Sequence, residues 1–347
     1  MTKHGGRRLA VGEARRGRAF HMGWVLQPGA AVGVKQFVIG LGSFVPGLYR
    51  LLARGTGGSD SSRYCYAVWL RHLVTAHSHG LASAPPAAVA ELGPGDSLGV
   101  GLAALICGSD RYVGLDAVQH ASTPRNLSVF DELVDLFRRR STVPTESEFQ
   151  ELEPPLATAE FPAHVLTDEH LRAALAPARL ATLRRELATL RPGRTQGPHI
   201  RYVAPWHDLS LLPAASVDMV LSQAVLEHVG DPALVHRAAR HWLRPGGFVS
   251  HQIDFRSHGL AAAWNGHWAY GDLEWRLILG RRPYLLNREP HSAHGRLLRE
   301  AGFDIVCDLA KRGGPGLGRS RLAPRFRDLS DDDLTTASAF IQARRAP

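Results

Sequence analysis

The chain has 347 residues, of which 44% are hydrophobic, so it can bury the core of one large domain or of two ordinary ones. Its formal net charge is +9, but lysine occurs only at positions 3, 35 and 311, and six basic residues fall within the first eighteen positions. This distribution is typical of a solvated basic tail, and we do not expect nucleic acid to be the partner.

The cysteines and the apolar segments indicate the compartment. Cys65, Cys107 and Cys307 are odd in number and lack the spacing of zinc ligands, which favours a reduced environment. No apolar run is long enough to cross a membrane, and no apolar stretch directly follows the basic N-terminus, as a secretory signal would require. We therefore expect a cytoplasmic protein.

Residues 1–56 are predicted to form a basic N-terminal extension with short apolar helices, around Lys35 to Val45 and around Pro46 to Arg54. The apolar segment 37–52 allows peripheral contact with a membrane. Its glycines and Pro46, however, are incompatible with a strongly amphipathic helix face. This favours a helix pair that covers a substrate cleft over a membrane-bound helix. One α/β domain is expected over 57–347, beginning with an amphipathic helix over 61–76.

The rest of the chain alternates between strand and helix patterns. Seven short apolar segments are predicted to be strands: 89–92, 111–115, 200–204, 217–222, 248–253, 303–309 and 337–343. Helices are predicted over 98–107, 232–243 and 291–301. This alternation predicts an α/β fold with a Rossmann-like, mostly parallel seven-stranded sheet and helices on both faces.

The segment between the second and third predicted strands is too long for one connection. Residues 117–199 contain two helical patterns, over 127–139 and 167–190, on either side of a proline-rich acidic stretch over 144–162. We therefore predict a helical insertion after the second strand.

The strongest local signal is a glycine-rich turn that follows the first strand and opens a helix. Gly93 and Gly95 permit a tight turn at which a ligand can approach the backbone closely. The next strand ends in Asp116, where an acid can accept hydrogen bonds from ribose hydroxyls. The sequence therefore predicts a nucleoside-binding site at this turn.

The charges around the turn favour a cationic ligand. The dinucleotide-binding pattern requires a glycine where Leu98 stands. Glu91 and Asp96 place negative charge where a pyrophosphate would lie, but they suit a ligand with a sulfonium and an α-amino group.

Segments in order along the chain resemble the motifs of class I methyltransferases that use S-adenosylmethionine (SAM), and those of the methyltransferase type 11 group in particular. They are 91–95 with Asp116, 208–213, 216–229 and 243–248. The resemblance covers about residues 86–255 apart from the insertion, and it implies SAM as the cofactor. Ser97 departs from the family, which more commonly has glycine there.

The resemblance assigns cofactor-binding roles by position. It implies contacts of Glu91, Gly93, Gly95 and Asp96 with the methionine end, of Asp116 with the ribose, of Asp208 and Leu209 with the adenine, and of Ser222 and Gln223 with the surroundings of the transferable methyl group. The long insertion is not typical of the family, so the resemblance assigns nothing to residues 118–126.

Candidate catalytic residues follow the fourth and fifth strands, at the edge where open α/β sheets place their crevice. Methyl transfer requires alignment, exclusion of water and, for some acceptors, removal of a proton. We predict that His228 or His258 is the general base and that Asp254 orients it, although either histidine would also suit a structural role. His251, Asp254 and His258 have the chemistry of metal ligands, but their spacing fixes no geometry and no metal is predicted.

The expected acceptor is a small molecule, such as a glycan or a secondary metabolite. Histidines surround the expected crevice, rather than cysteines or a nucleobase-methylating Asn-Pro-Pro-Tyr motif, which favours transfer to oxygen. Asn287 and Arg288 would either grip an acidic or sugar substrate or fix a loop, and Trp268 and Trp275 would either wall off the substrate or fill the core.

Two alternatives remain at this point. A nicotinamide-dependent short-chain oxidoreductase would carry Tyr-x-x-x-Lys, but Ala31 and Cys307 stand four places before Lys35 and Lys311. A non-catalytic module with the same fold would have no need to keep its glycines and acids, which the sequence retains.

Overall fold

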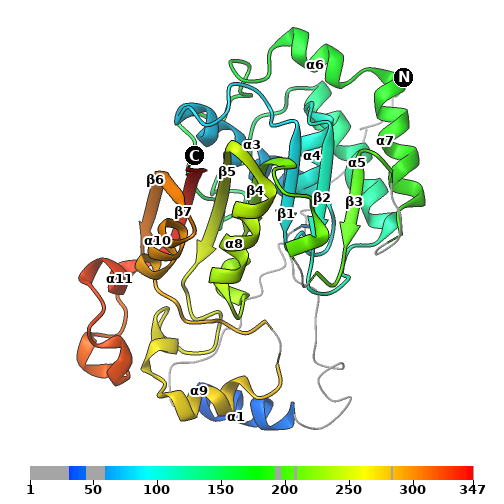
Figure 1. The fold of residues 1–347 in the computed structure, drawn as a ribbon. Coiled ribbons are helices and arrows are strands. Elements are labelled where there is room, and N and C mark those ends of the chain that lie inside the picture. Colours follow the sequence, from blue (N-terminus) through cyan, green and yellow to red (C-terminus); the bar gives the residue numbers. More distant parts are fainter. Residues whose placement is uncertain (1–30, 44–58, 192–196, 207–208, 283, 347) are drawn as a thin grey trace, which may run out of the picture.

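The computed structural model describes residues 31–43, 59–191, 197–206, 209–282 and 284–346. Its centre is a seven-stranded sheet with the strand order β3-β2-β1-β4-β5-β7-β6 (Figure 1). The strands are β1 (Ala88–Leu92), β2 (Arg111–Leu115), β3 (Ile200–Val203), β4 (Val217–Gln223), β5 (Leu243–Asp254), β6 (Phe303–Arg312) and β7 (Thr336–Arg345). Neighbours from β3 to β5 are parallel, whereas β7 is antiparallel to β5 and β6. The predicted fold class is confirmed.

The strand order places a topological switch point at the carboxyl ends of β1 and β4. The chain passes from β1 outward through β2 to β3 and then returns to β4 on the other side of β1. Leu92 of β1 pairs with Leu115 of β2 and with Ser222 of β4. The residues that directly follow these three therefore lie side by side, at the switch point where open α/β sheets bind ligands.

One face of the sheet is covered by α3 (Ser62–Ser78), α4 (Gly99–Ile106), α5 (Thr123–Arg138) and α7 (Pro177–Thr189), which share one hydrophobic cluster. Every residue of α4 is buried, because this helix lies between the sheet and its neighbouring helices α3 and α5. A Cβ at Gly101 would come within 1.9 Å of the Tyr112 ring, so glycine lets α4 lie directly on β2.

The other face is covered by α8 (Pro232–Trp242) and α10 (His291–Glu300) (Figure 1). Helix α8 begins where Asp231 accepts a hydrogen bond from the backbone N–H of Leu234 at 3.0 Å, and Pro232 occupies the first turn. Trp242 at the end of α8 is fully buried in the second hydrophobic cluster, together with Leu298 of α10. Helices on both faces agree with the prediction.

The predicted insertion contains helices on either side of a non-helical stretch over 141–166, and it extends the first hydrophobic cluster. The single helix predicted over 167–190 is divided into α6 (Asp168–Ala174) and α7. The division falls directly before Pro177, whose ring is compatible with the first turn of a helix but not with its interior. Leu171 of α6 and Leu183 of α7 are both buried in the cluster.

Helices α1 (Ala31–Gly42) and α9 (Asp272–Leu279) pack against each other on the side of the molecule toward which the parallel strands end (Figure 1). A Cβ at Gly40 would come within 2.0 Å of the Leu277 carbonyl oxygen, so the two backbones are in close contact. The first predicted N-terminal helix is thus present, and the second one, over 46–54, lies outside the described residues.

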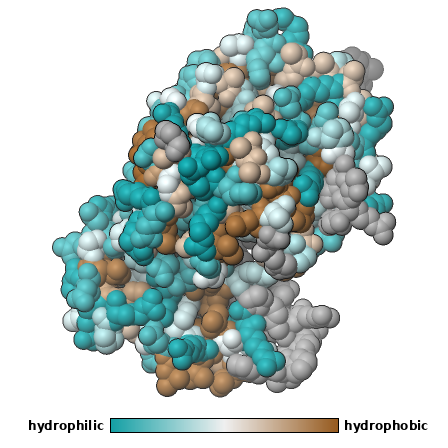
Figure 2. All heavy atoms as spheres, viewed as in Figure 1, coloured by the Kyte–Doolittle hydropathy of each residue, from teal (hydrophilic) through white to brown (hydrophobic). Residues whose placement is uncertain are grey.

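The surface of this helix pair carries several exposed apolar side chains. Val38 and Leu41 of α1 and Leu273 and Leu277 of α9 are exposed, and brown side chains gather at the lower end of the molecule in Figure 2. Within the described ranges, no helix combines the length and the hydropathy that crossing a bilayer would require.

Candidate functional site

The glycine turn after β1 has the backbone conformation that the sequence predicts. Gly93 and Gly95 have φ angles of 63° and 76°, which favour glycine. The Gly93 N–H donates to the Leu115 carbonyl at 2.8 Å and thereby ties the turn to the end of β2. A Cβ at Gly93 would lie 2.6 Å from Cγ2 of Val225, so the turn and the segment after β4 are in direct contact.

Asp116 lies directly at this turn. Its Oδ2 accepts from the Gly95 N–H at 3.2 Å, and its Oδ1 accepts from the Ala117 N–H at 2.8 Å. Burial raises the pKa of this carboxyl above its usual value, and the two N–H groups oppose the shift. The structure therefore brings together the glycines and the acid that the sequence pairs.

The segment that would bind adenine runs beside Asp116. The Trp206 N–H donates to the Asp116 carbonyl at 3.0 Å. Asp208 lies outside the described residues. Leu209 follows it and begins a short 3-10 helix, and its carbonyl accepts from Nε1 of Trp242 at 2.7 Å.

The two acids near the turn occupy different surroundings. Glu91 is buried, accepts a hydrogen bond from the Tyr112 hydroxyl at 2.7 Å and lies on the face of the sheet that α4 covers. Burial raises the pKa of Glu91 to about 7. Asp96 is 8% exposed and lies in the turn itself. Glu91 thus lies buried between the sheet and α4, whereas Asp96 is part of the turn itself.

Ser222 and Gln223 point to opposite faces of the sheet, because consecutive strand residues alternate. Ser222 is fully buried, and its hydroxyl lies 2.8 Å from Nδ1 of His251 on the side of α8. Gln223 lies on the side of α3, where its Oε1 is 3.3 Å from Nε2 of His72. Of the two, only Gln223 is partly exposed.

The predicted catalytic residues meet beyond the ends of β4 and β5. The His228 and His258 rings lie edge to face, with centroids 5.1 Å apart. Nε2 of His258 lies 3.3 Å from Oδ2 of Asp254, which also forms an ion pair of 2.5 Å with Arg256. Glu227, which precedes His228, is buried beside them.

The charges of this cluster follow from burial and from the ion pairs. Burial lowers the pKa of His228 to about 4 and raises the pKa of Glu227 to about 8. The Asp254 carboxylate raises the pKa of His258 above its usual value, against the effect of burial. His258 and Arg256 hold the pKa of Asp254 well below its usual range, so that this carboxylate is charged at neutral pH.

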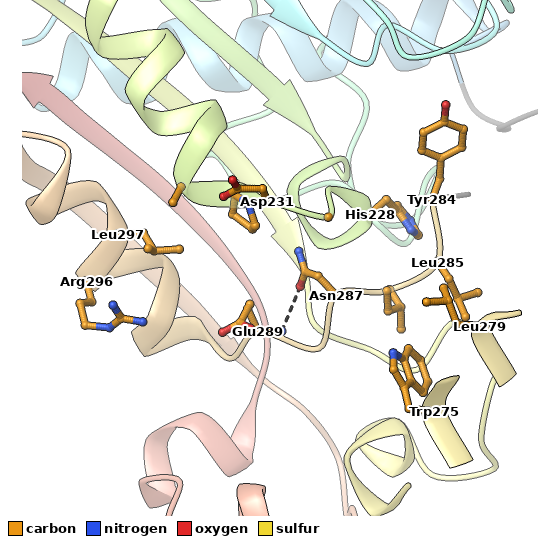
Figure 3. A pocket seen from close by; sticks show the side chains of 14 residues that line it. His228, Asp231, Trp275, Leu279, Tyr284, Leu285, Asn287, Glu289, Arg296 and Leu297 are labelled. Carbon is orange, nitrogen blue, oxygen red and sulfur yellow. Dashed lines mark hydrogen bonds between the residues drawn. The ribbon is translucent and has the colours of Figure 1, made fainter. Parts of the chain in front are cut away.

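A cavity of about 630 Å³ adjoins His228 (Figure 3). It lies between the start of α8, helix α10, helix α9 and the segment 284–289. Its lining is mixed, with Trp275, Tyr284 and Leu285 beside Asn287 and Glu289. Its size suits a small organic molecule.

Several residues around this cavity have structural partners. The Asn287 side-chain amide donates to the Leu226 and Val229 carbonyls at 2.7 and 2.9 Å, so it fixes the segment that carries His228. Arg288 is buried, with its guanidinium 4.5 Å from the centre of the Trp275 ring. The sequence leaves two roles open for Asn287 and Arg288, the binding of a substrate or the fixing of a loop. These contacts favour the fixing of a loop. Trp268 is fully buried in the core, whereas Trp275 also lines the cavity.

Sequence reasoning missed Val225 and the cavity wall around Tyr284. Val225 meets Gly93 only because β1 and β4 are neighbours, and nothing in its own surroundings marks it. Ala224, His258, Tyr284 and Arg288 all have positive φ angles, a conformation that residues other than glycine rarely adopt. A backbone signal of this kind is not visible in residue types.

Comparison with known proteins identifies a family match for part of the chain. Residues 174–250 match the sequence profile of a family described as a methyltransferase domain. The matched span contains β3, β4, α8 and most of β5, and it leaves out the glycine turn. A search of curated protein sequences finds no match.

Three solved structures with a similar fold are also methyltransferases by name. A putative sarcosine dimethylglycine methyltransferase from Galdieria sulphuraria is 10% identical, with a TM-score of 0.40, over 79% of this chain and 84% of its own. A SAM-dependent methyltransferase from Mesorhizobium loti is 14% identical, with a TM-score of 0.36, over 83% of this chain and 100% of its own. The trans-methyltransferase CalH, solved with S-adenosylhomocysteine, is 14% identical, with a TM-score of 0.40, over 90% of this chain and 66% of its own.

Proposed function

We propose that this chain, a class I SAM-dependent methyltransferase, transfers the methyl group to an oxygen atom of a small molecule such as a glycan or a secondary metabolite. The observation that carries the proposal is the His258–Asp254 pair, whose imidazole packs against the ring of His228, a residue that lines a cavity of about 630 Å³. An oxygen acceptor loses a proton when it is methylated, and a histidine held by a carboxylate is suited to accept it.

The residues at the glycine turn fit the cofactor. Gly93 and Gly95 leave the backbone accessible without a Cβ, and the Asp116 carboxylate lies within hydrogen-bond distance of the turn. Asp116 would accept from the ribose hydroxyls, and Asp96 would face the cationic amino-acid end. When bound, SAM supplies a methyl group that its positive sulfur already activates.

The chain's own residues would then orient the acceptor and take up its proton. Asp254 raises the pKa of His258 and so strengthens this imidazole as a proton acceptor. His228, with a pKa of about 4, stays neutral and can hydrogen-bond the acceptor in the cavity that it lines. The segment 284–289, which lines the cavity, would exclude water and determine which acceptors fit.

An acceptor screen tests the reaction class. The purified protein is incubated with SAM and a panel of hydroxylated sugars, phenols and polyols, and the release of S-adenosylhomocysteine is measured. The position of the new methyl group is then determined by NMR. We expect transfer to oxygen, and transfer to nitrogen or carbon would contradict the proposal.

The pH profile of the same reaction tests the proton acceptor. His258→Ala should lower kcat by about 10²- to 10⁴-fold, as expected for loss of a general base. Asp254→Asn should lower the pKa of His258, because it removes the opposite charge, and so move the rising limb of kcat/KM to lower pH. His291→Ala, at an ion pair with Asp308 on β6, is the control for loss of a histidine. A profile that Asp254→Asn leaves unmoved would exclude this role.

A non-catalytic module with the same fold is distinguished by the same assay. Such a module would release no S-adenosylhomocysteine with any acceptor, and the His258–Asp254 pair would serve no chemical step.

A further inference from the structure

Three side chains with metal-binding chemistry converge next to the acceptor cavity. Glu227, His228 and His258 each offer one ligand atom, and these atoms all lie within 4.8 Å of one another. Glu227 and His228 come from the short helix after β4, and His258 comes from the segment after β5. The sequence places His228 and His258 at the same edge of the sheet but does not single out these three residues as one group, because His228 and His258 are thirty positions apart.

Two members of this group, Glu227 and His228, have buried polar atoms without hydrogen-bond partners among the described residues. Glu227 is 3% exposed, and neither of its carboxylate oxygens has a hydrogen-bond partner among the described residues. The same holds for Nδ1 of His228. A buried polar group without a partner is costly, and buried carboxylates are normally paired or bound to a metal. A metal ion bound between these atoms would give both the Glu227 carboxylate and the His228 ring a partner.

Asp254 is not one of the three candidate ligands, but it holds one of them, His258, in place. A histidine that binds a metal normally donates its other ring N–H to a carboxylate or carbonyl, which fixes the ring and raises its basicity. Nε2 of His258 lies 3.3 Å from Oδ2 of Asp254. Arg256 holds the same carboxylate through Nη2, at 2.5 Å. Asp254 and Arg256 therefore fix the orientation of His258, and neither of them is one of the three candidate ligands.

We propose that Glu227, His228 and His258 bind a divalent transition-metal ion of the Zn²⁺ class, with an open coordination position toward the acceptor cavity. Two imidazoles and one carboxylate are a common ligand set for such ions, and three protein ligands leave room for a further oxygen. Because His228 also lines the cavity, a hydroxyl bound there could fill that position. This differs from the sequence-based expectation of no metal.

The proposed ion would change how the acceptor loses its proton. An oxygen bound to such an ion has a lowered pKa, so with the ion in place the proton can leave to water, whereas without the ion His258 remains the proton acceptor. The inference uses the site of the proposed function, but it does not depend on which atom is methylated. The two proposals can therefore fail separately.

Direct binding is the first test. The protein is treated with a chelator, dialysed and titrated with Zn²⁺ by calorimetry and with Co²⁺ by visible absorption. We expect one ion per chain and a Co²⁺ spectrum of a low-coordinate nitrogen and oxygen site. Glu227→Gln and His258→Ala should each weaken binding at least about tenfold, and Asp254→Asn about 10- to 100-fold.

Matched controls separate this site from general effects of substitution. Glu153→Gln changes another buried glutamate, which pairs with Ser338 and Lys311, and His291→Ala changes another ion-paired histidine. Both should bind Zn²⁺ as the wild type does. His258 is partly exposed, so His258→Ala should fold even if Glu227→Gln does not, as a thermal melt will show.

Two results would overturn the inference: no stoichiometric Zn²⁺ or Co²⁺ binding by the wild type, or equal binding by the wild type and His258→Ala. Methyl transfer by the chelated protein, without loss of rate, would leave the proposed function intact and show that the ion is not needed for it. Metal binding with methylation at nitrogen or carbon would leave the metal site intact and exclude the proposed function.

Discussion

At the scale of single residues, the site depends on contacts between segments that are distant in the sequence. The glycine turn and Asp116 were predictable, because a strand, a glycine bend and an acid 21 positions later form a pattern along the chain. The contact of Gly93 with Val225 was not, and neither was the opposite orientation of Ser222 and Gln223. Both depend on which strands are neighbours and on their register.

The contact between Gly93 and Val225 can be tested with a double-mutant cycle. Gly93→Ala places a Cβ 2.6 Å from Val225 Cγ2, at a φ of 63°, and should lower the free energy of unfolding by about 1–3 kcal/mol. Val225→Ala removes the clashing methyls, so the double mutant should recover part of this loss. Urea unfolding measures all three variants, and strictly additive losses would show that the two residues do not interact.

At the scale of elements, the alternation of strands and helices was the reliable signal. All seven strands were predicted, because each is a short apolar segment between turn residues. The insertion was predicted as helical, but not its division at Pro177 or its packing against α4. Loops after β5 could not be predicted, because their positions are set by contacts with α1, α10 and β7 rather than by a periodic pattern.

Arg179 of α7 provides a test of how the insertion is attached. Its guanidinium donates to the Leu105 carbonyl at 2.7 Å and to the Ser109 carbonyl at 2.6 Å, at the end of α4. Arg179→Met leaves these carbonyls without that donor and should lower the free energy of unfolding by about 1–3 kcal/mol. Arg185→Met, on the exposed side of the same helix, is the control. Equal effects of the two variants in urea unfolding would mean that the Arg179 contacts contribute nothing.

At the scale of the whole molecule, many ionisable groups are buried in the uncharged form. Burial lowers the pKa of His72, His228 and His236 to about 4, and that of His267 and His294 to about 3. It also raises the pKa of Glu91 to about 7 and of Glu227 to about 8. Stability should therefore depend on pH in both directions.

The sign of each effect follows from proton uptake on unfolding. The histidines contribute stability that is present above the unfolded pKa of about 6.5 and is lost as pH falls toward 4. The two glutamates contribute stability that is present below about 4.5 and is lost as pH rises through 7 and 8. Because the histidines outnumber the glutamates, we expect maximal stability near pH 6.5, with a loss of at least about 2 kcal/mol by pH 5. Urea unfolding across this range measures it, and a constant free energy between pH 6.5 and 5 would contradict the burial of neutral histidines.

The central claim is that SAM binds where the glycine turn meets Asp116. Calorimetric titration with S-adenosylhomocysteine, of the wild type and of Asp116→Ala, tests it most directly. We predict that the wild type binds one molecule per chain and that Asp116→Ala loses about 1–3 kcal/mol of binding free energy with the ribose hydrogen bonds. Absence of binding by the wild type, or the same affinity in both proteins, would contradict the account.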